Sequence, residues 1–176
     1  MPFTPPDPND TIPPPTPLAP IVVRPLAATD AAAARALFTS AFGNTLYAEA
    51  PRTALARALD GPNDGEAGGV VAVADGEVVG VAVYGFVPGT DRTAKMHGMA
   101  VAADSRRHGV ARTLIDAFVA ELTGAGARLV VVEFPDAPEL AGGRTLLLHS
   151  RFAEEARLAD YFLDGIALAF LRRDLV

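Results

Sequence analysis

The chain has 176 residues, half of them hydrophobic, and a formal net charge of −6 at pH 7. This length and composition predict one globular domain with a sizeable core. The acidic balance argues against a general nucleic-acid binder, which needs a basic face to release counterions, and the absence of cysteine excludes disulfides, thiolate metal sites and a cysteine nucleophile.

The first twenty residues differ in kind from the rest, because they carry nine of the 15 prolines. Proline fixes φ and removes a hydrogen-bond donor, so residues 1–20 are predicted to be an extended or disordered tail ahead of a domain over residues 21–176. The segment lacks the basic and apolar regions of a secretory signal, and no apolar run reaches the roughly 20 residues of a membrane span. We expect a cytoplasmic protein that binds no metal, nucleic acid or membrane. Two possibilities are left open: the protein forms a homodimer, and its tail binds a proline-recognition module.

The domain is predicted to begin with a strand over residues 21–26. A helix follows over 30–42, because its apolar residues recur at helical spacing and Thr29 or Asp30 can cap it. The sequence LYAEAPRTALARAL suggests a second helix within 46–59.

The middle of the chain is predicted to form three strands and a helix. Residues 60–69 are expected to be a loop because they combine glycine, proline, aspartate and asparagine. Two β-branched runs then flank Asp75-Gly76, which is a strong hairpin signal. A third strand is expected over 93–103, and an amphipathic helix over 107–123 follows it.

The last part of the chain alternates between strands and one further helix. Gly124 is placed to end the preceding helix, and the apolar run over 128–134 predicts a strand covered on both faces. A helix is expected within 139–152, and a closing hairpin turns at Asp164-Gly165. The element order β-α-α-β-β-β-α-β-α-β-β fits an α/β fold with a mixed sheet and helices on both faces.

The stretch SRRHGVARTLI gathers cations around one glycine at the start of a predicted helix. Arg106, Arg107, His108 and Arg112 surround Gly109. The first turn of a helix leaves unpaired N–H groups and a partial positive charge, which favour phosphate. Arginines add charge-assisted donors. A solvated helix end is the alternative interpretation, although cations at a helix N-terminus are mildly unfavourable.

At this stretch the sequence resembles the GNAT superfamily of acyl-CoA-dependent N-acetyltransferases. MAVAADSRRHGVARTLI is similar to the pattern L-x-V-x-P-x-x-[RQ]-x-x-G-x-[GA]-x-x-L of that superfamily, with alanine in place of the proline. The matching positions are Met99, Val101, Arg106, Gly109, Ala111 and Leu114. The element order over residues 21–176 and the closing segment RFAEEARLADYFLDGIALAFLRRDL are also similar.

The resemblance implies a central mixed, mostly antiparallel sheet and acetyl-CoA as co-substrate. The strands over 93–103 and 128–134 would splay apart at their carboxyl ends and admit acyl-CoA. Its pantetheine arm would lie along Met99–Val101, where a backbone N–H would polarise the thioester carbonyl. Its pyrophosphate would lie on backbone N–H groups near the start of the helix. The residues expected to bind it are Met99, Ala100, Val101, Arg106, Arg107, His108, Gly109, Val110, Ala111 and Arg112; the side chains of Arg107, His108 and Arg112 meet either phosphate or solvent.

Two residues are candidates for handling the proton of the acceptor amine. His97 lies in the strand at a place where some arylalkylamine-acetylating members carry a histidine, and strand periodicity puts 95, 97, 99 and 101 on one side. A hydrogen-bonded sheet histidine is the alternative. Glu133 lies at the end of the strand that would line the cleft. Its possible roles are a base, a binding group for the substrate ammonium, or a partner in an ion pair. Lys95 stands where some protein-acetylating members carry a glutamate base.

The closing segment departs from the family pattern in its general acid. Leu147 stands where a tyrosine is common, so water or another residue such as Tyr84 would have to protonate the thiolate. His149 is nearby, in the core or on the surface. Arg151 replaces the glycine of a G-F pair, so the preceding helix is predicted to end without the usual left-handed glycine.

An acceptor pocket is expected from the first two helices and the strand ends. Its candidate residues are the aromatic side chains Phe42, Tyr47, Tyr84 and Phe86, each of which has the hydrophobic core as its alternative place. The predicted function is N-acetyl transfer from acetyl-CoA to a primary amine, with a small molecule preferred. The alternatives are a non-catalytic acyl-CoA-binding or regulatory protein and an interaction module that uses the proline-rich tail.

Overall fold

The structure, a computed structural model, describes residues 20–60 and 67–175. The proline-rich tail predicted over residues 1–20 lies outside this part of the chain, apart from Pro20. The elements are β1 (Val22–Pro25), η1 (Ala28–Asp30), α1 (Ala31–Phe42), η2 (Leu46–Ala48), α2 (Glu49–Asp60), β2 (Ala67–Ala74), β3 (Glu77–Phe86), β4 (Thr93–Val101), η3 (Ala103–Ser105), α3 (Val110–Gly124), β5 (Leu129–Pro135), η4 (Pro138–Leu140), α4 (Ala141–His149), β6 (Ala153–Leu163) and β7 (Ile166–Asp174), where η marks a 3-10 turn. The order of helices and strands agrees with the sequence prediction.

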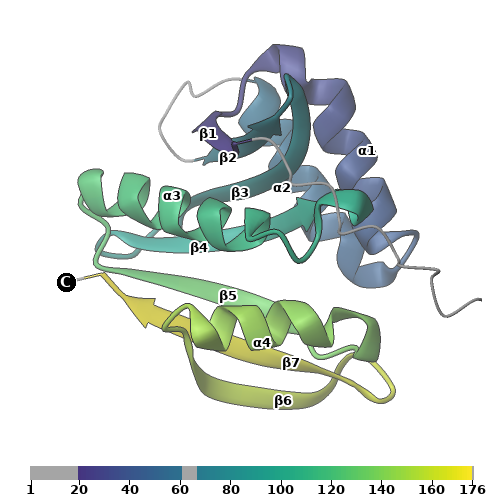
Figure 1. Ribbon diagram of the computed structural model, residues 1–176. Helices are drawn as coiled ribbons and strands as arrows, with labels where there is room; N and C mark the ends of the chain where they lie inside the picture. The colour runs from purple at the N-terminus through teal and green to yellow at the C-terminus, as the bar shows by residue number, and fades with distance from the viewer. Residues whose placement is uncertain (1–19, 61–66, 176) are drawn as a thin grey trace, which may run out of the picture.

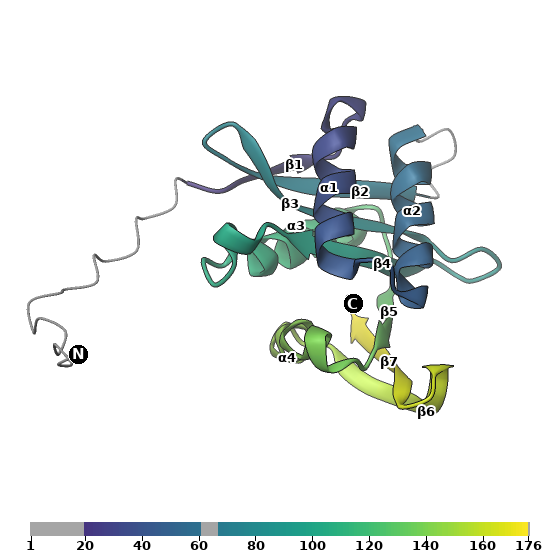
Figure 2. The same ribbon diagram turned by 90° about the vertical axis from the view of Figure 1, so that its right-hand side faces the viewer.

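Within residues 20–60 and 67–175, seven strands form one mixed sheet in the order β1-β2-β3-β4-β5-β7-β6. All neighbours run antiparallel except β4 and β5, which are parallel because α3 crosses over between them. Helices α1 and α2 cover one face, and α3 and α4 cover the other (Figures 1 and 2). The predicted mixed sheet, mostly antiparallel and with helices on both faces, is confirmed.

Each face of the sheet has its own hydrophobic core. Phe38 of α1 packs in one core with Val81 and Val83 of β3. Phe118 of α3 packs in the other core with Tyr84, also of β3. Successive side chains of a strand point to opposite faces, so this central strand contributes to both cores. Side chains on the two faces therefore lie in separate environments. The face on which a candidate residue lies determines which other side chains it can contact.

Both predicted Asp-Gly hairpins are present. Asp75 and Gly76 are left-handed, with φ of 51° and 81°, as a two-residue turn of type I′ requires. The second turn joins β6 to β7, and its Gly165 has φ of 81°. The loop predicted over 60–69 is too long, since β2 begins at Ala67 and the two glycines that follow it pair with β3.

The C-terminus of α3 differs from the prediction by two residues. Gly124 is the last helical residue, and the left-handed position is Gly126, with φ of 79°. The N–H of Ala127 donates to the carbonyl of Leu122, and that of Gly126 donates to Thr123, both at 2.9 Å. This 6→1 and 5→2 pair of bonds is a Schellman motif. The glycine that ends the helix is therefore Gly126 and not Gly124.

Asp30 is a buried carboxylate that, unlike the prediction, makes no side-chain cap on α1. It accepts two hydrogen bonds from the Arg24 guanidinium, at 2.7 and 2.8 Å, and one from the N–H of Ala27 at 2.9 Å. These bonds hold β1 against the turn η1 that leads into α1. The bonds from Arg24 are the main reason that the pKa of Asp30 lies below its ordinary value.

We expect the substitution Asp30→Asn to lower the free energy of unfolding by about 2–3 kcal/mol at pH 7, because an amide cannot maintain the charge-assisted pair. The carboxylate has a lowered pKa in the folded state. Its contribution is therefore present above the unfolded pKa of about 3.9 and is lost as the pH falls through the folded pKa. Urea unfolding of both proteins at pH 7 and pH 3 tests this, and an equal difference at the two pH values would contradict it.

Helix α4 ends in a left-handed residue, as a glycine would provide, but that residue is Arg151 with φ of 67°. A non-glycine residue in this conformation costs roughly 1 kcal/mol or more. The sequence correctly indicated that α4 is not followed by the usual glycine. The backbone nevertheless keeps the left-handed conformation that this glycine would adopt, with Arg151 in its place.

Replacing Arg151 with glycine should raise the free energy of unfolding by about 1 kcal/mol, because glycine adopts positive φ without strain. The corresponding rise in Tm is roughly 2–4 °C for a chain of this size. Arg35→Gly, within the exposed face of α1, is the matched control and should lower stability by about 1 kcal/mol. A fall in Tm for both variants would show that Arg151 is not strained.

Candidate active site

Strands β4 and β5 pair over only part of their lengths. Their parallel register runs from Thr93 opposite Leu129 to Met96 opposite Val132. β4 then continues to Val101 and β5 to its own end, and Figure 1 shows the two strands spreading apart. The predicted divergence is confirmed. We call the region between residues 97–101 of β4 and 133–135 of β5 the fork.

A β-bulge at His97 marks the point where β4 leaves β5. On β3, Val83 pairs with Gly98 and the next residue, Tyr84, pairs with Met96, so His97 has no partner there. The extra residue breaks the alternation of side chains along β4.

The predicted alternation of 95, 97, 99 and 101 on one side is therefore wrong. Met99 and Val101 pack with the α3 core, as Met96 does. Lys95 precedes Met96 and points to the opposite face, because neighbouring residues of a strand alternate. The bulge thus separates the part of β4 expected to carry pantetheine from the titratable side chains near its start.

The turn between β4 and α3 leaves the helix N-terminus open. Arg107 and Gly109 are left-handed, with φ of 66° and 82°, so α3 begins at Val110 and not at the predicted residue 107. Its first intrahelical bond runs from the N–H of Thr113 to the carbonyl of Gly109 at 3.0 Å. Among the described residues, the N–H groups of residues 110–112 have no recorded acceptor. A Cβ at Gly109 would meet nothing within 4 Å, so the glycine is required by its φ and leaves space on that side.

The cations around this helix start fall into two groups. Nε of Arg106 donates to the carbonyl of Val101 at 3.3 Å, which ties the turn to the end of β4. Nε of Arg112 lies 3.2 Å from the Asp116 carboxylate one turn along α3. Arg107 and His108 are exposed and stand beside the open N–H groups. An anion at this place would therefore meet backbone donors first, in keeping with the helix dipole.

The two predicted catalytic residues lie together on the α2 side of the fork. Nζ of Lys95 lies 2.8 Å from a carboxylate oxygen of Glu133, whose side chain is 40% exposed. Burial lowers the pKa of His97 to about 4, with help from the positive charges of Lys95 and Arg57, while Glu133 acts in the opposite direction. The imidazole is therefore neutral at pH 7 and able to accept a proton. The alternative interpretation of Glu133, an ion pair, holds for this structure.

The predicted acceptor aromatics do not lie together. Tyr47 in η2 is buried near the start of α2, and its hydroxyl donates to the Glu139 carboxylate in η4, just after β5. The Tyr47 ring also meets Phe162 of β6 edge to face, with centroids 6.0 Å apart. The Phe42 ring contacts that of Phe38 in a tilted arrangement, with centroids 5.5 Å apart, and belongs mainly to the core of α1 and α2.

Glu139 and Phe162 were not found from the sequence. Tyr47 and Glu139 are 92 residues apart, and no local spacing relates them. They meet because α2 packs on β4, where Pro51 would be only 2.8 Å from a Cβ at Gly98, while η4 follows the end of β5. The contact therefore bridges the two halves of the divided sheet beyond the fork.

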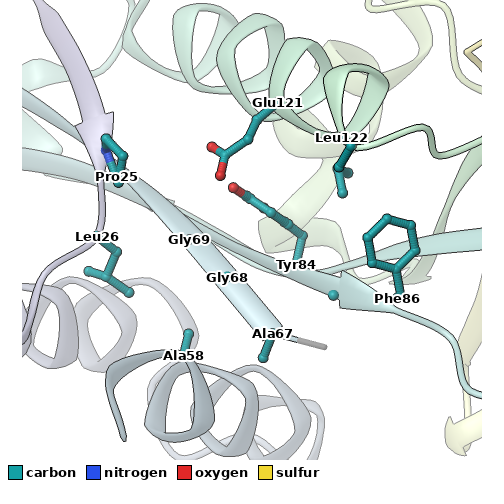
Figure 3. Close-up of a pocket in the computed structure, with 12 residues that line it drawn as sticks. Pro25, Leu26, Ala58, Ala67, Gly68, Gly69, Tyr84, Phe86, Glu121 and Leu122 are labelled. Carbon is teal, nitrogen blue, oxygen red and sulfur yellow. The ribbon is translucent and has the colours of Figure 1, made fainter. Parts of the chain in front are cut away.

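Tyr84 and Phe86 lie elsewhere. Tyr84 is buried under the last turns of α3 and stacks on Phe118. Both Tyr84 and Phe86 line a pocket with Glu121 and Leu122 of α3 (Figure 3). This pocket is at the end of α3 opposite the open N-terminus, so the structure separates these two aromatics from Tyr47. The predicted alternative acid, Tyr84, has a pKa far above its ordinary value because it is buried.

A divided mixed sheet with an open helix N-terminus beside the fork is the arrangement that the sequence resemblance implies. The family model of the acetyltransferase (GNAT) family matches residues 32–139, more than half of the chain. The protein therefore belongs to this family of acetyltransferase enzymes. No curated protein is significantly similar in sequence. Within the described residues, no helix is long and apolar enough to cross a membrane.

Solved structures of the family share the fold. A GNAT-family protein from Desulfovibrio desulfuricans has a TM-score of 0.79 at 22% identity, over 89% of this chain and 100% of the other. For yncA from Salmonella typhimurium, solved with its cofactor acetyl-CoA, the TM-score is 0.73 at 18% identity, over 89% and 94%. The ribosomal-protein-S18-alanine N-acetyltransferase from Escherichia coli has a TM-score of 0.70 at 17% identity, over 88% and 94%. These identities establish likeness of fold alone.

Proposed function

We propose that this protein transfers an acetyl group from acetyl-CoA to the primary amino group of a small molecule by direct attack. The observation that carries the proposal is the fork beside the open start of α3. β4 leaves its partner strand after Met96, and the N–H groups of residues 110–112 have no acceptor in the described part of the chain. An extended ligand with an anionic end would find hydrogen-bond partners at both places.

The residues present fit acetyl-CoA, which would supply the reactive thioester. Residues 99–101 offer a backbone edge that β5 does not cover. Gly109 leaves room for a phosphate beside the free N–H groups, and Arg107 and His108 add exposed donors there. Met99 and Val101 give the same edge an apolar lining on the α3 side. Backbone N–H groups in this position would hold the carbonyl oxygen and stabilise the charge that develops on it.

His97 and Glu133 are proposed to manage the proton of the attacking amine. His97 stays neutral above pH 5 because its pKa is about 4, so its free nitrogen accepts the proton that the amine releases on attack. Glu133 holds the incoming ammonium, which loses one proton to water before it attacks as the neutral amine, and keeps Lys95 paired beside the histidine. Leu147 has no ionisable proton and Tyr84 lies under α3, away from the fork, so the leaving thiolate takes its proton from water.

The side of the fork near η2 supports a small acceptor that is partly apolar. Tyr47 and Phe162 form an aromatic wall, and the carboxylates of Glu133 and Glu139 are suited to a cation. Phe42 lies in the α1–α2 core, in contact with Phe38. A mixed aromatic and acidic surface recognises an ammonium attached to an apolar body. This mixture of groups favours a primary amine over a polycation.

The proposal is tested by measuring free CoA released from acetyl-CoA with a panel of amines. The panel should include benzylamine, a linear alkylamine, a polyamine and a peptide with an N-terminal alanine. We expect turnover with the aromatic or alkyl amine to exceed that with the peptide and the polyamine. Preference for the peptide would indicate a protein acceptor. Acetyl-CoA binding by calorimetry without release of CoA for any amine would support a non-catalytic acyl-CoA-binding protein instead.

A further inference from the structure

A second pocket lies away from the fork, at the end of the sheet near the last turns of α3. It has a volume of about 250 Å³, and its lining includes Gly68 of β2, Tyr84 of β3 and Glu121 and Leu122 of α3. Pro25 and Leu26 close it on the β1 side (Figure 3). None of the residues proposed to hold acetyl-CoA lines it. The pocket is therefore a site that the acetyltransferase reaction does not use.

The hydroxyl of Tyr84 points into this pocket. The residue is 5% exposed, yet no group within the described part of the chain meets its hydroxyl with good hydrogen-bond geometry. A buried polar group without a partner costs roughly 1–3 kcal/mol, so such groups are normally satisfied by the protein, water or a ligand. The Tyr84 ring is held by its stacking on Phe118 at 5.8 Å, which keeps the hydroxyl in this orientation.

The carboxylate of Glu121 points toward the same hydroxyl (Figure 3). After burial, Glu121 is the next cause of the raised pKa of Tyr84, first through a side-chain hydrogen bond and then through its negative charge. Glu121 has no ion-pair partner among the described residues. The pocket therefore combines a buried phenol oxygen with an exposed carboxylate that has no ion-pair partner in the described part of the chain.

The rest of the pocket is apolar and shaped by glycine. A Cβ at Gly68 would lie 3.2 Å from the Tyr84 ring, so the absence of a side chain there lets the ring lie over β2. Leu122, Leu26 and Pro25 provide hydrocarbon walls. At roughly 30 Å³ for a water-sized group, the volume suits a ligand of about eight heavy atoms.

We propose that this pocket binds a small primary ammonium compound with an apolar body. The ammonium would donate one hydrogen bond to the Glu121 carboxylate and one to the phenol oxygen of Tyr84. The phenol hydrogen would then be donated to the carboxylate, which gives each polar group a partner. The apolar body would lie against Leu122 and the surface left bare by Gly68. This site is separate from the acceptor side of the fork.

Two-dimensional amide NMR spectra of the full chain test the proposal, with benzylamine as the probe and benzyl alcohol as its neutral analogue. We expect benzylamine to shift the amide signals of Gly68, Gly69 and Gly85 in a saturable way, independently of any shift at Gly98 in the fork. Benzyl alcohol should bind there at least about tenfold more weakly, because it cannot form the charge-assisted bond.

Glu121→Gln should weaken benzylamine binding at these signals at least about tenfold, while Glu77→Gln, an exposed glutamate at the β2–β3 turn, should leave it unchanged. Tyr84→Phe should weaken it severalfold and still fold, since the hydroxyl that is removed makes no well-formed hydrogen bond within the protein. Shifts confined to the fork, equal binding of the alcohol, or binding that survives both Glu121→Gln and Tyr84→Phe would overturn the proposal.

Discussion

Acetyl-CoA binding is expected to fall at least about a hundredfold when Gly109 is replaced by glutamate. The new carboxylate would stand beside the free N–H groups at the start of α3 and compete with the phosphates for them. It would also repel those phosphates and fill the space that is now open on this side of the turn. Isothermal calorimetry with acetyl-CoA measures the effect.

The left-handed φ of Gly109 makes a control necessary, because any side chain there is strained. Gly89→Glu, in the β3–β4 connection, is well matched: its φ is 75° and a Cβ would meet nothing within 4 Å. Both variants should lose a similar amount of stability, roughly 1 kcal/mol. Only the Gly109 variant should lose acetyl-CoA. Equal affinity in the two variants would exclude the α3 N-terminus as the phosphate site.

Replacing His97 with glutamine should lower kcat/KM for the amine by about a hundredfold, which is typical for the loss of a proton acceptor, and leave acetyl-CoA affinity unchanged. Since the pKa of His97 is about 4, the unmodified protein should keep this function at pH 5.5. A histidine of ordinary pKa, near 6.5, would be mostly protonated there. The acidic limb assigned to His97 is therefore expected near pH 4 in a kcat/KM profile.

The position of that limb can be shifted through Lys95, the only lysine in the chain. Lys95→Met removes a positive charge that lowers the pKa of His97 and leaves Glu133, which raises it. The acidic limb should therefore move upward from pH 4 toward pH 6.5. Lys95→Arg keeps the charge and should leave the limb in place. A limb that does not respond to Lys95→Met, or that persists in His97→Gln, would assign the titration to another group.

Much of the fold could be predicted from local patterns. The Asp-Gly pairs at 75–76 and 164–165 produced the expected hairpins: Asp75, Gly76 and Gly165 adopt positive φ, which few other residue types accept in a turn. Helix ends were less predictable. The pair Gly124 and Gly126 could each end α3, and only the Schellman bonds to Leu122 and Thr123 select the second.

The open start of α3 was the part of the site most accessible to sequence reasoning. Gly109 and its cations occupy one short stretch, so their spacing carries the geometry of a turn and a helix N-terminus. The family match over residues 32–139 includes this stretch. The proton-handling residues were proposed singly, and their grouping could not be predicted because Lys95 and Glu133 come from strands joined through α3.

The sequence by itself determined the order of the elements, the turns and the residues that begin α3, because each depends on neighbours within a few positions. The tertiary structure alone decided which side chains share a face. A single bulged residue, His97, reverses the alternation along β4. The packing of α2 on β4 places Tyr47 against Glu139, 92 residues away. Packing also decides that Tyr84 faces α3. Strand periodicity reveals two alternating sets of side chains, but only the helices packed on the two faces of the sheet decide what each set contacts.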